Sequence, residues 1–124
     1  MSDVFISYSR ANIDFARNLF KSLYNRNYEV WIDLEGIRFT ADWWEEIKRG
    51  IENTRNFVLV MSSNSLSSPV CHLEIEYARK LNKRIILLNH QTVDKGTSSR
   101  AMLDRLASDA YVNTLLGDRN PMKL

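Results

Sequence analysis

The sequence predicts an α/β fold in which helices cover both faces of a parallel β-sheet. Three observations support this prediction. Short β-branched and aromatic runs alternate with amphipathic helical segments over most of the chain. The run at residues 57–61 is apolar at every position, which is typical of a strand buried on both faces. Polar residues follow each expected strand, as they do where a site forms at the carboxyl ends of parallel strands.

The first half of the chain supplies two strands and two helices. Residues 4–7 predict the first strand because they are β-branched and aromatic. Asn12 is expected to cap the helix that follows. The apolar stripe of this helix consists of Ile13, Ala16, Leu19, Phe20 and Leu23. Residues 28–32 predict the second strand, residues 33–39 a loop, and residues 41–54 the second helix.

The second half of the chain is clear at first and then loses its pattern. A Ser-rich run at residues 62–68 leads to Pro69, a favoured first residue of a helix. Residues 84–88 predict the fourth strand, and residues 99–107 a short helix. Residues 110–124 show no clear period. We therefore expect the last strand and the last helix of the fold to be missing, as in a fragment of a longer protein.

Composition narrows the classes of function. The 124 residues suffice for one domain, residues 1–124, and their formal net charge of +2 does not indicate nucleic-acid binding. The single cysteine, Cys71, excludes an internal disulfide and fits a reducing compartment. No apolar run reaches membrane-spanning length, and no signal peptide precedes the first strand. We expect a cytoplasmic protein without a membrane partner.

Motifs for several kinds of bound group are missing from the sequence. No Gly-rich phosphate loop follows an expected strand. His72 and His90 have no partners at metal-ligand spacing, and one cysteine cannot complete a zinc site. Cys71 and His72 are adjacent and point apart on a helix, which argues against a Cys/His nucleophile pair. The sequence thus predicts neither a metal site nor a resident cofactor.

Glu74 is the residue that departs most from the expected helical pattern. The helix at residues 69–81 has an apolar stripe formed by Val70, Leu73, Tyr77, Ala78 and Leu81. At about 100° of rotation per residue, Glu74 falls within this stripe. It either lies at the stripe's edge, reaching water or a basic side chain, or is a desolvated functional carboxylate in a pocket. The second interpretation is favoured because the helix follows the third strand, whose end faces the same crevice.

Four separate segments together resemble the TIR (Toll/interleukin-1 receptor) domain family in its bacterial form. They are DVFISYS at 3–9, VWID at 30–33 with the loop that follows, RNFVLVMS at 55–62, and CHLE at 71–74. The first is similar to the opening strand and box 1, the second to strand B and the BB loop, and the third to the third strand. The last resembles the C-x-x-E segment of the family. The resemblance covers about residues 3–90, and the motifs occur in order at suitable spacings.

The resemblance implies a flavodoxin-like fold and an NAD⁺ glycohydrolase. Such an enzyme releases nicotinamide and ADP-ribose, or a cyclic isomer of ADP-ribose, when TIR domains assemble. The resemblance makes Glu74 the catalytic glutamate. The substrate-binding residues that it implies are Phe5, Tyr8, Ser9 and Arg10 on the nicotinamide and ribose side, and Asp33, Arg38 and Trp43 on the BB-loop side. Other TIR domains are the implied partners, through the BB loop at residues 33–41, in an N-terminal effector domain of antiphage defence.

Two alternatives to this function remain open at the level of sequence. The chain could be a TIR adaptor without catalytic activity that acts through TIR–TIR contacts. It could also resemble nucleoside 2-deoxyribosyltransferases, whose related fold uses a glutamate on a glycosidic bond. One departure from the catalytic relatives concerns substrate packing, because Val70 stands where these relatives often carry a tryptophan that stacks on the substrate.

Overall fold

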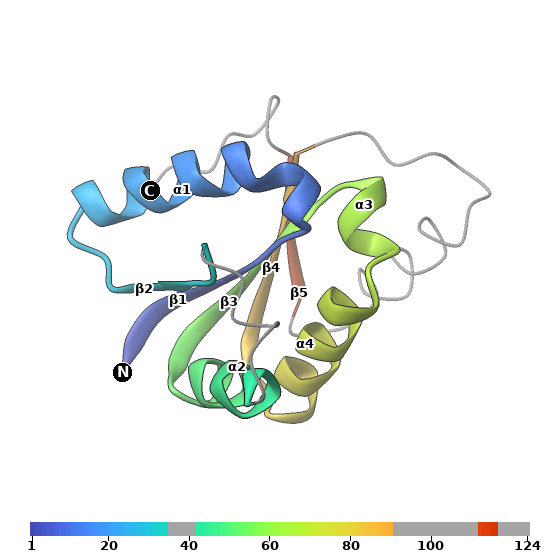
Figure 1. Cartoon of the computed structure of the whole chain (residues 1–124). Helices are drawn as coiled ribbons and strands as arrows, with labels where there is room; N and C mark the ends of the chain where they lie inside the picture. Colours follow the sequence, from blue (N-terminus) through green and yellow to red (C-terminus); the bar gives the residue numbers. More distant parts are fainter. Residues whose placement is uncertain (35–41, 91–111, 117–124) are drawn as a thin grey trace.

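A computed structural model of the chain describes residues 1–34, 42–90 and 112–116, and shows a parallel sheet of five strands (Figure 1). The strands are β1 (Ser2–Ser7), β2 (Val30–Ile32), β3 (Thr54–Met61), β4 (Arg84–Asn89) and β5 (Val112–Leu116). Their order across the sheet is β2-β1-β3-β4-β5, and each neighbouring pair is parallel. The predicted α/β fold with a parallel sheet is therefore confirmed.

The helices follow the strands as the sequence predicts. They are α1 (Ile13–Asn25), α2 (Trp43–Glu52), α3 (Ser63–Leu66) and α4 (Pro69–Lys80), with a 3₁₀ turn η1 (Arg10–Asn12) before α1. The short helix α3 lies in the Ser-rich run at residues 62–68. It forms because Ser62 and Ser65 make a capping box, in which each hydroxyl accepts from the other residue's backbone N–H.

The prediction that the last strand is missing is wrong. Val112–Leu116 forms β5, which pairs in parallel with β4 from Ile85 opposite Val112 to Asn89 opposite Leu116. The five residues of β5 carry too little local pattern to be recognised in sequence, so pairing with β4 determines their conformation. The predicted helix at residues 99–107 and the expected absence of a closing helix concern residues outside those that the structure describes.

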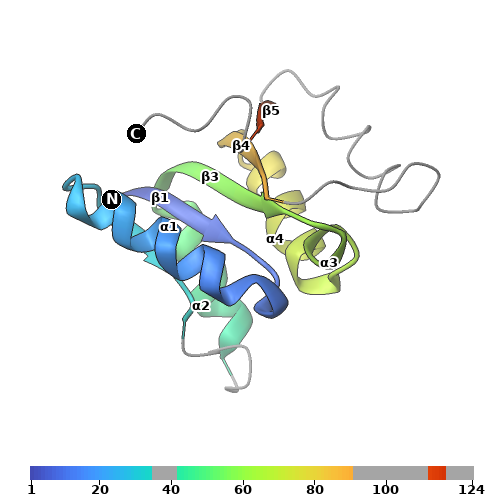
Figure 2. The ribbon, with the colours of Figure 1, turned by 90° about the horizontal axis from the view of Figure 1, so that it is seen from above.

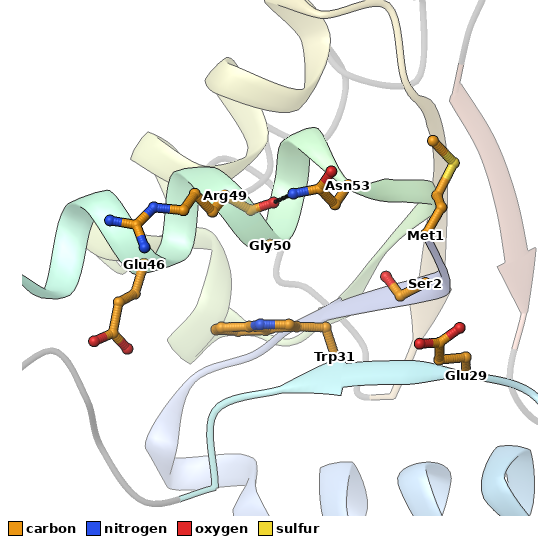
Figure 3. Close-up of a pocket in the computed structure, with 8 residues that line it drawn as sticks. All are labelled: Met1, Ser2, Glu29, Trp31, Glu46, Arg49, Gly50 and Asn53. Atoms are coloured by element: carbon orange, nitrogen blue, oxygen red, sulfur yellow. Dashed lines mark hydrogen bonds between the residues drawn. The ribbon is translucent and has the colours of Figure 1, made fainter.

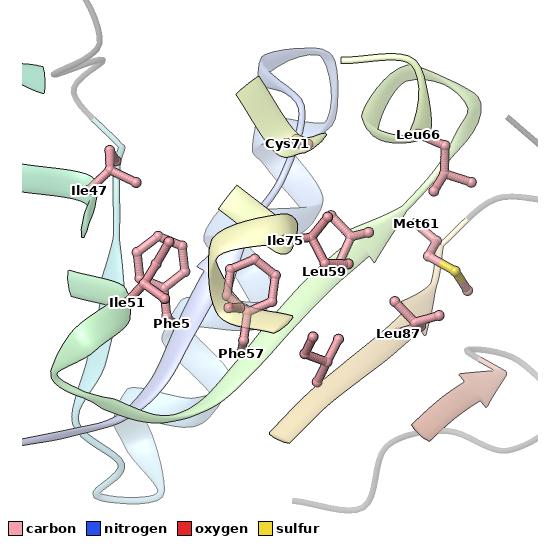
Figure 4. Packing of buried hydrophobic residues seen from close by; sticks show 12 residues of the cluster. Phe5, Ile47, Ile51, Phe57, Leu59, Met61, Leu66, Cys71, Ile75 and Leu87 are labelled. Carbon is pink, nitrogen blue, oxygen red and sulfur yellow. The ribbon is translucent and has the colours of Figure 1, made fainter. Parts of the chain in front are cut away.

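The helices form two layers around the sheet (Figures 1 and 2). On one face, α1 packs on Val4, Ile6 and Tyr8 of the β1 region. On the other face, α2, α3 and α4 pack on the residues that alternate with these, and Figure 4 shows this core. Phe5 is at its centre, with its ring stacked on Trp31 at 4.7 Å and on Phe57 at 5.3 Å between centroids. Because side chains alternate along β1, Ser7 lies on the same face as Phe5 and points toward α4.

The buried face of α4 differs from the predicted apolar stripe. Its buried residues are Cys71, Glu74, Ile75 and Ala78, whereas Leu73 is 49% exposed and Leu81 is 37% exposed. The predicted stripe was wrong because two overlapping sets of apolar residues at helical spacing exist in this segment, and the packing of Cys71 and Ile75 on the sheet selects the other set. The rotation places Glu74 in the middle of the buried face, more deeply than its position in the predicted stripe suggested.

Candidate functional site

Glu74 is a buried carboxylate at the carboxyl edge of the sheet. Helix α4 starts at Pro69, and the Ser68 hydroxyl accepts a hydrogen bond from the Cys71 backbone N–H at its N-terminus. This start places Glu74 on the second turn, where its side chain is only 4% exposed. The Ser7 hydroxyl at the end of β1 donates a hydrogen bond of 2.8 Å to Glu74 Oε1. The interpretation in which Glu74 extends from the stripe's edge into water is therefore wrong.

The chain that leaves β1 also holds the chain that leaves β2. The Tyr8 hydroxyl donates a hydrogen bond to the backbone carbonyl of Asp33. Arg10 Nη1 donates to the Tyr8 hydroxyl at 2.8 Å and to the same Asp33 carbonyl at 3.0 Å, and Arg10 Nη2 donates to the Leu34 carbonyl at 3.3 Å. Tyr8 and Arg10 thus fix the start of the loop after β2 relative to the end of β1. Their predicted substrate contacts stay a prediction.

A third buried contact joins the end of β3 to the start of α1. The Ser62 hydroxyl donates a hydrogen bond of 2.7 Å to Asn12 Oδ1, and both side chains are buried. Asn12 occupies the N-cap position of α1, but its side chain makes no capping hydrogen bond there. The prediction that Asn12 caps α1 is therefore right in position and wrong in mechanism, because the side chain binds Ser62 across 50 positions of sequence.

The other predicted site residues occupy different environments. Phe5 has no exposed area and lies in the core beneath Ser7. The Ser9 hydroxyl accepts a hydrogen bond of 3.3 Å from the Ala11 N–H, which caps η1. Asp33 is buried, and Trp43 is the first residue of α2, partly buried against the core. Arg38 lies outside the described residues.

Ser7 is the site residue that sequence reasoning missed. A serine at the end of a strand reads as an ordinary strand-terminating polar residue. The signal that could have found it is the alternation along β1, which puts Ser7 on the buried face shared with Phe5. A polar side chain on that face requires a partner, and Glu74 on the adjacent helix supplies one.

Each of the two histidines has a defined partner in the fold. His72 Nε2 donates to the carbonyl of Leu66, which ties α4 to α3. His90 follows β4, with its ring stacked at 4.0 Å on Phe15, and burial lowers the pKa of its imidazole below the ordinary value.

Among residues 1–34 and 42–90, no three His, Cys, Asp or Glu side chains are grouped so that they could hold a metal ion. No helix in the described part is long and apolar enough to cross a bilayer.

A separate cavity of about 420 Å³ lies at the opposite, amino edge of the sheet (Figure 3). It is lined by Met1, Ser2, Glu29, Trp31, Glu46, Arg49, Gly50 and Asn53. Gly50 lets α2 approach Trp31 closely, since a Cβ at this position would lie 2.9 Å from Trp31 Cε2. Ligands of parallel α/β sheets bind at the carboxyl ends of the strands. The candidate site is therefore the edge that carries Ser7 and Glu74, and this cavity is not part of it.

Comparisons with known proteins agree with this architecture. The family model of the TIR domain matches residues 4–116. The TIR domain of the Toll-related receptor TRR-2 from Hydra magnipapillata superimposes with a TM-score of 0.71 at 18% identity, over 91% of this chain and 84% of that one. The TIR domains of the activated Roq1 resistosome, which directly recognises the pathogen effector XopQ, give 0.66 at 19% identity, over 88% and 72% of the two chains.

A glycosidase has a similar fold as well. The CMP N-glycosidase BcmB from Clostridium botulinum superimposes with a TM-score of 0.63 at 18% identity, over 92% of this chain and 88% of that one. The identities are low, so these structural similarities establish the fold alone. No match to the chain is found among the curated proteins.

Proposed function

Because the chain belongs to the TIR domain family, we propose that it is an NAD⁺ glycohydrolase with Glu74 as its catalytic residue. The reaction cleaves the bond between nicotinamide and ribose and gives nicotinamide with ADP-ribose or a cyclic isomer of it. The observation that carries the proposal is the buried position of the Glu74 carboxylate at the carboxyl edge of the sheet. A desolvated acid that replaces an apolar residue on a helix face is a feature of functional sites rather than of stable cores.

A single carboxylate is sufficient for this reaction. Most glycosidases need a second acid that protonates the leaving group. Nicotinamide is bound to ribose as a positively charged pyridinium and leaves as a neutral molecule, so it needs no proton. The breaking bond leaves positive charge on the ribose, and the Glu74 carboxylate would stabilise that charge and accept hydrogen bonds from ribose hydroxyls. Water then adds to the ribose carbon and loses a proton to give ADP-ribose, or an internal nucleophile adds there to give the cyclic isomer. A carboxylate in a buried setting does this better than one in water, because its charge is less screened.

The remaining substrate contacts are proposed from the family resemblance and from position. Ser9 and Arg10 follow β1 at the same edge as Glu74, and Asp33 and Trp43 flank the loop after β2. Arg38, in that loop, would hold a phosphate of the substrate. Phe5 and Tyr8 are buried, so in this proposal they would support the residues that contact the substrate.

We further propose that the activity depends on self-assembly. In this scheme the BB loop of one copy, residues 33–41, completes the site of a neighbouring copy, so an isolated chain turns over little NAD⁺. The TIR domains of the activated Roq1 resistosome have a fold similar to that of this chain, and this similarity supports an active form made of several copies. The biological setting we propose is cytoplasmic antiphage defence in a bacterium, with this domain as the N-terminal effector of a longer protein.

The test uses the chain fused to an artificial oligomerising domain. Nicotinamide release from NAD⁺ is measured for wild type, Glu74→Gln and Glu76→Gln. Glu76 is a matched control because it lies two residues away on α4, is exposed, and pairs with Arg79 at 3.0 Å. We expect release by wild type and Glu76→Gln but not by Glu74→Gln. If none of the assembled proteins releases nicotinamide, the proposal fails. If they also turn over none of the alternative substrates, the chain is an adaptor.

The same assay includes CMP as a second substrate. The similar fold of the Clostridium botulinum CMP N-glycosidase favours this control, since that enzyme also breaks an N-glycosidic bond. Release of cytosine that requires Glu74, without release of nicotinamide from NAD⁺, would make the chain a nucleotide N-glycosidase and replace the proposal. A base-exchange reaction between nucleosides would identify the transferase alternative.

A further inference from the structure

We propose that Ser7 is a positioning residue for the reaction, whose hydroxyl holds the Glu74 carboxylate in the orientation that the substrate needs. This inference rests on the proposed function and adds a residue that the family resemblance did not supply. The contact is a hydrogen bond of 2.8 Å between Ser7 Oγ and Glu74 Oε1. Both side chains are almost fully buried, with 1% and 4% of their areas exposed.

The backbone of Ser7 is held by the sheet on the β3 side. Ser7 pairs with Leu59 on β3 at the last position of β1, and β1 itself lies between β2 and β3. A group that ends a central strand moves less than a group on a loop, so its hydroxyl is a fixed reference point for a side chain on α4. Glutamate has three side-chain torsions, and the hydrogen bond to the fixed Ser7 hydroxyl favours the rotamer that brings Oε1 to this donor.

The chemistry of the donor matters as much as its position. A hydroxyl orients the carboxylate without cancelling its negative charge, whereas a lysine or arginine at position 7 would neutralise the charge that stabilises a cationic ribose. A carboxylate accepts about four hydrogen bonds over its two oxygens, so one bond to Ser7 is compatible with further bonds to ribose hydroxyls. The pair therefore combines a defined geometry with a retained charge.

The neighbouring serine does not share this role. Ser9 binds its own segment, because its hydroxyl accepts from the Ala11 N–H at the start of η1. The two serines that follow the apolar part of β1 thus have different partners, one on α4 and one in the local backbone. Of these two serines, Ser7 is the one that hydrogen-bonds to the proposed catalytic residue.

The kinetic test compares Ser7→Ala, Ser7→Thr and Ser63→Ala in the oligomerised protein. Ser63 is the control because it is exposed and belongs to α3 rather than to β1 or α4. We expect Ser7→Ala to lower kcat for nicotinamide release by roughly 10- to 100-fold, the range expected when a catalytic group is displaced by about 1 Å, with KM within about twofold of wild type. Ser7→Thr keeps the hydroxyl and should recover most of the loss. Equal losses in both variants, or an unchanged kcat in Ser7→Ala, would overturn the proposal.

A second measurement does not require activity. The Glu74 side-chain carboxyl is observed by NMR in protein labelled with ¹³C-glutamate and assigned from its absence in Glu74→Gln. Ser7→Ala should shift or broaden this signal, and Ser7→Thr should restore it, while Ser63→Ala leaves it in place. If wild type releases no nicotinamide, the proposed function fails while this signal still reports whether Ser7 orients Glu74. A signal that ignores Ser7→Ala overturns the positioning role in either case.

Discussion

The contact between Ser7 and Glu74 leads to a quantitative prediction about stability. The perturbation is a double-mutant cycle of Ser7→Ala, Glu74→Met and the combined variant. Methionine is close to glutamate in size and removes the carboxylate, while alanine removes only the hydroxyl. A cycle isolates the energy of the pair from whatever else each residue touches.

The magnitude follows from burial and charge. A hydrogen bond to a charged group contributes about 1.5–3 kcal/mol, and the low exposure of the two side chains, 1% and 4%, means that water cannot replace a lost partner. Ser7→Ala removes a donor from a buried carboxylate, and Glu74→Met leaves a buried hydroxyl without this acceptor. The combined variant removes both groups, so it should lose less stability than the sum of the single losses, by about 1.5–3 kcal/mol.

The assay is urea unfolding at neutral pH, followed by far-UV circular dichroism, with comparison of slopes to confirm that all variants unfold alike. Ser63→Ala is the control, and as an exposed substitution it should stay within about 0.5 kcal/mol of wild type. Single losses that add up to the loss of the combined variant, within about 0.5 kcal/mol, would mean that the pair is not coupled. The reasoning about a positioned carboxylate would then be refuted.

Three further predictions concern residues outside the pair of Ser7 and Glu74. Gly50→Ala places a Cβ 2.9 Å from Trp31 Cε2. The overpacking should cost about 1–3 kcal/mol, which exceeds the roughly 1 kcal/mol by which alanine stabilises a helix relative to glycine, so the variant should be less stable than wild type. A higher urea midpoint than that of wild type would contradict this prediction. Burial lowers the pKa of His90, so the unfolded chain binds more protons than the folded one at low pH. The stability of the fold should therefore fall as the pH drops below about 6.5. In thermal melts, His90→Gln should reduce the dependence of the melting temperature on pH in this range. Arg10→Ala should cost about 1–3 kcal/mol in urea unfolding. Arg10→Lys should recover less than half of this loss, because lysine lacks the rigid fork by which two guanidinium nitrogens reach the Asp33 and Leu34 carbonyls.

The sequence predicted the parts of the molecule that local pattern determines. The strand around residues 57–61 was predicted because a short run of five consecutive apolar residues is typical of a strand buried on both faces. Pro69 predicted the start of α4. The orientation of α4 about its own axis was not predictable from sequence. Either Leu73 or Ile75 could lie on the buried face by local pattern, and packing on the sheet buries Ile75. Strand β5 was missed because its conformation depends on pairing with β4.

The candidate site was predicted in part for the same physical reason. Glu74 was found because an acid among apolar residues disturbs a local periodicity. Ser7 was missed because its partner is 67 positions away, and no local pattern distinguishes a serine that binds a helix from one that ends a strand. Asn12 was assigned a local role as a cap, whereas its side chain binds Ser62, which directly follows β3.

The three polar contacts at the carboxyl edge indicate which parts of the proposed active site self-assembly would have to complete. Ser7 fixes Glu74, Ser62 fixes the start of α1, and Tyr8 with Arg10 fixes the first residues of the loop after β2, all within one chain. The carboxylate that we propose to be catalytic is therefore already in place in an isolated copy. If an isolated copy turns over little NAD⁺, the deficit has to come from the substrate-binding side of the site. We therefore expect assembly to lower KM or complete the pocket while the Ser7–Glu74 geometry, and the ¹³C signal of Glu74, stay the same in the free and the oligomerised protein.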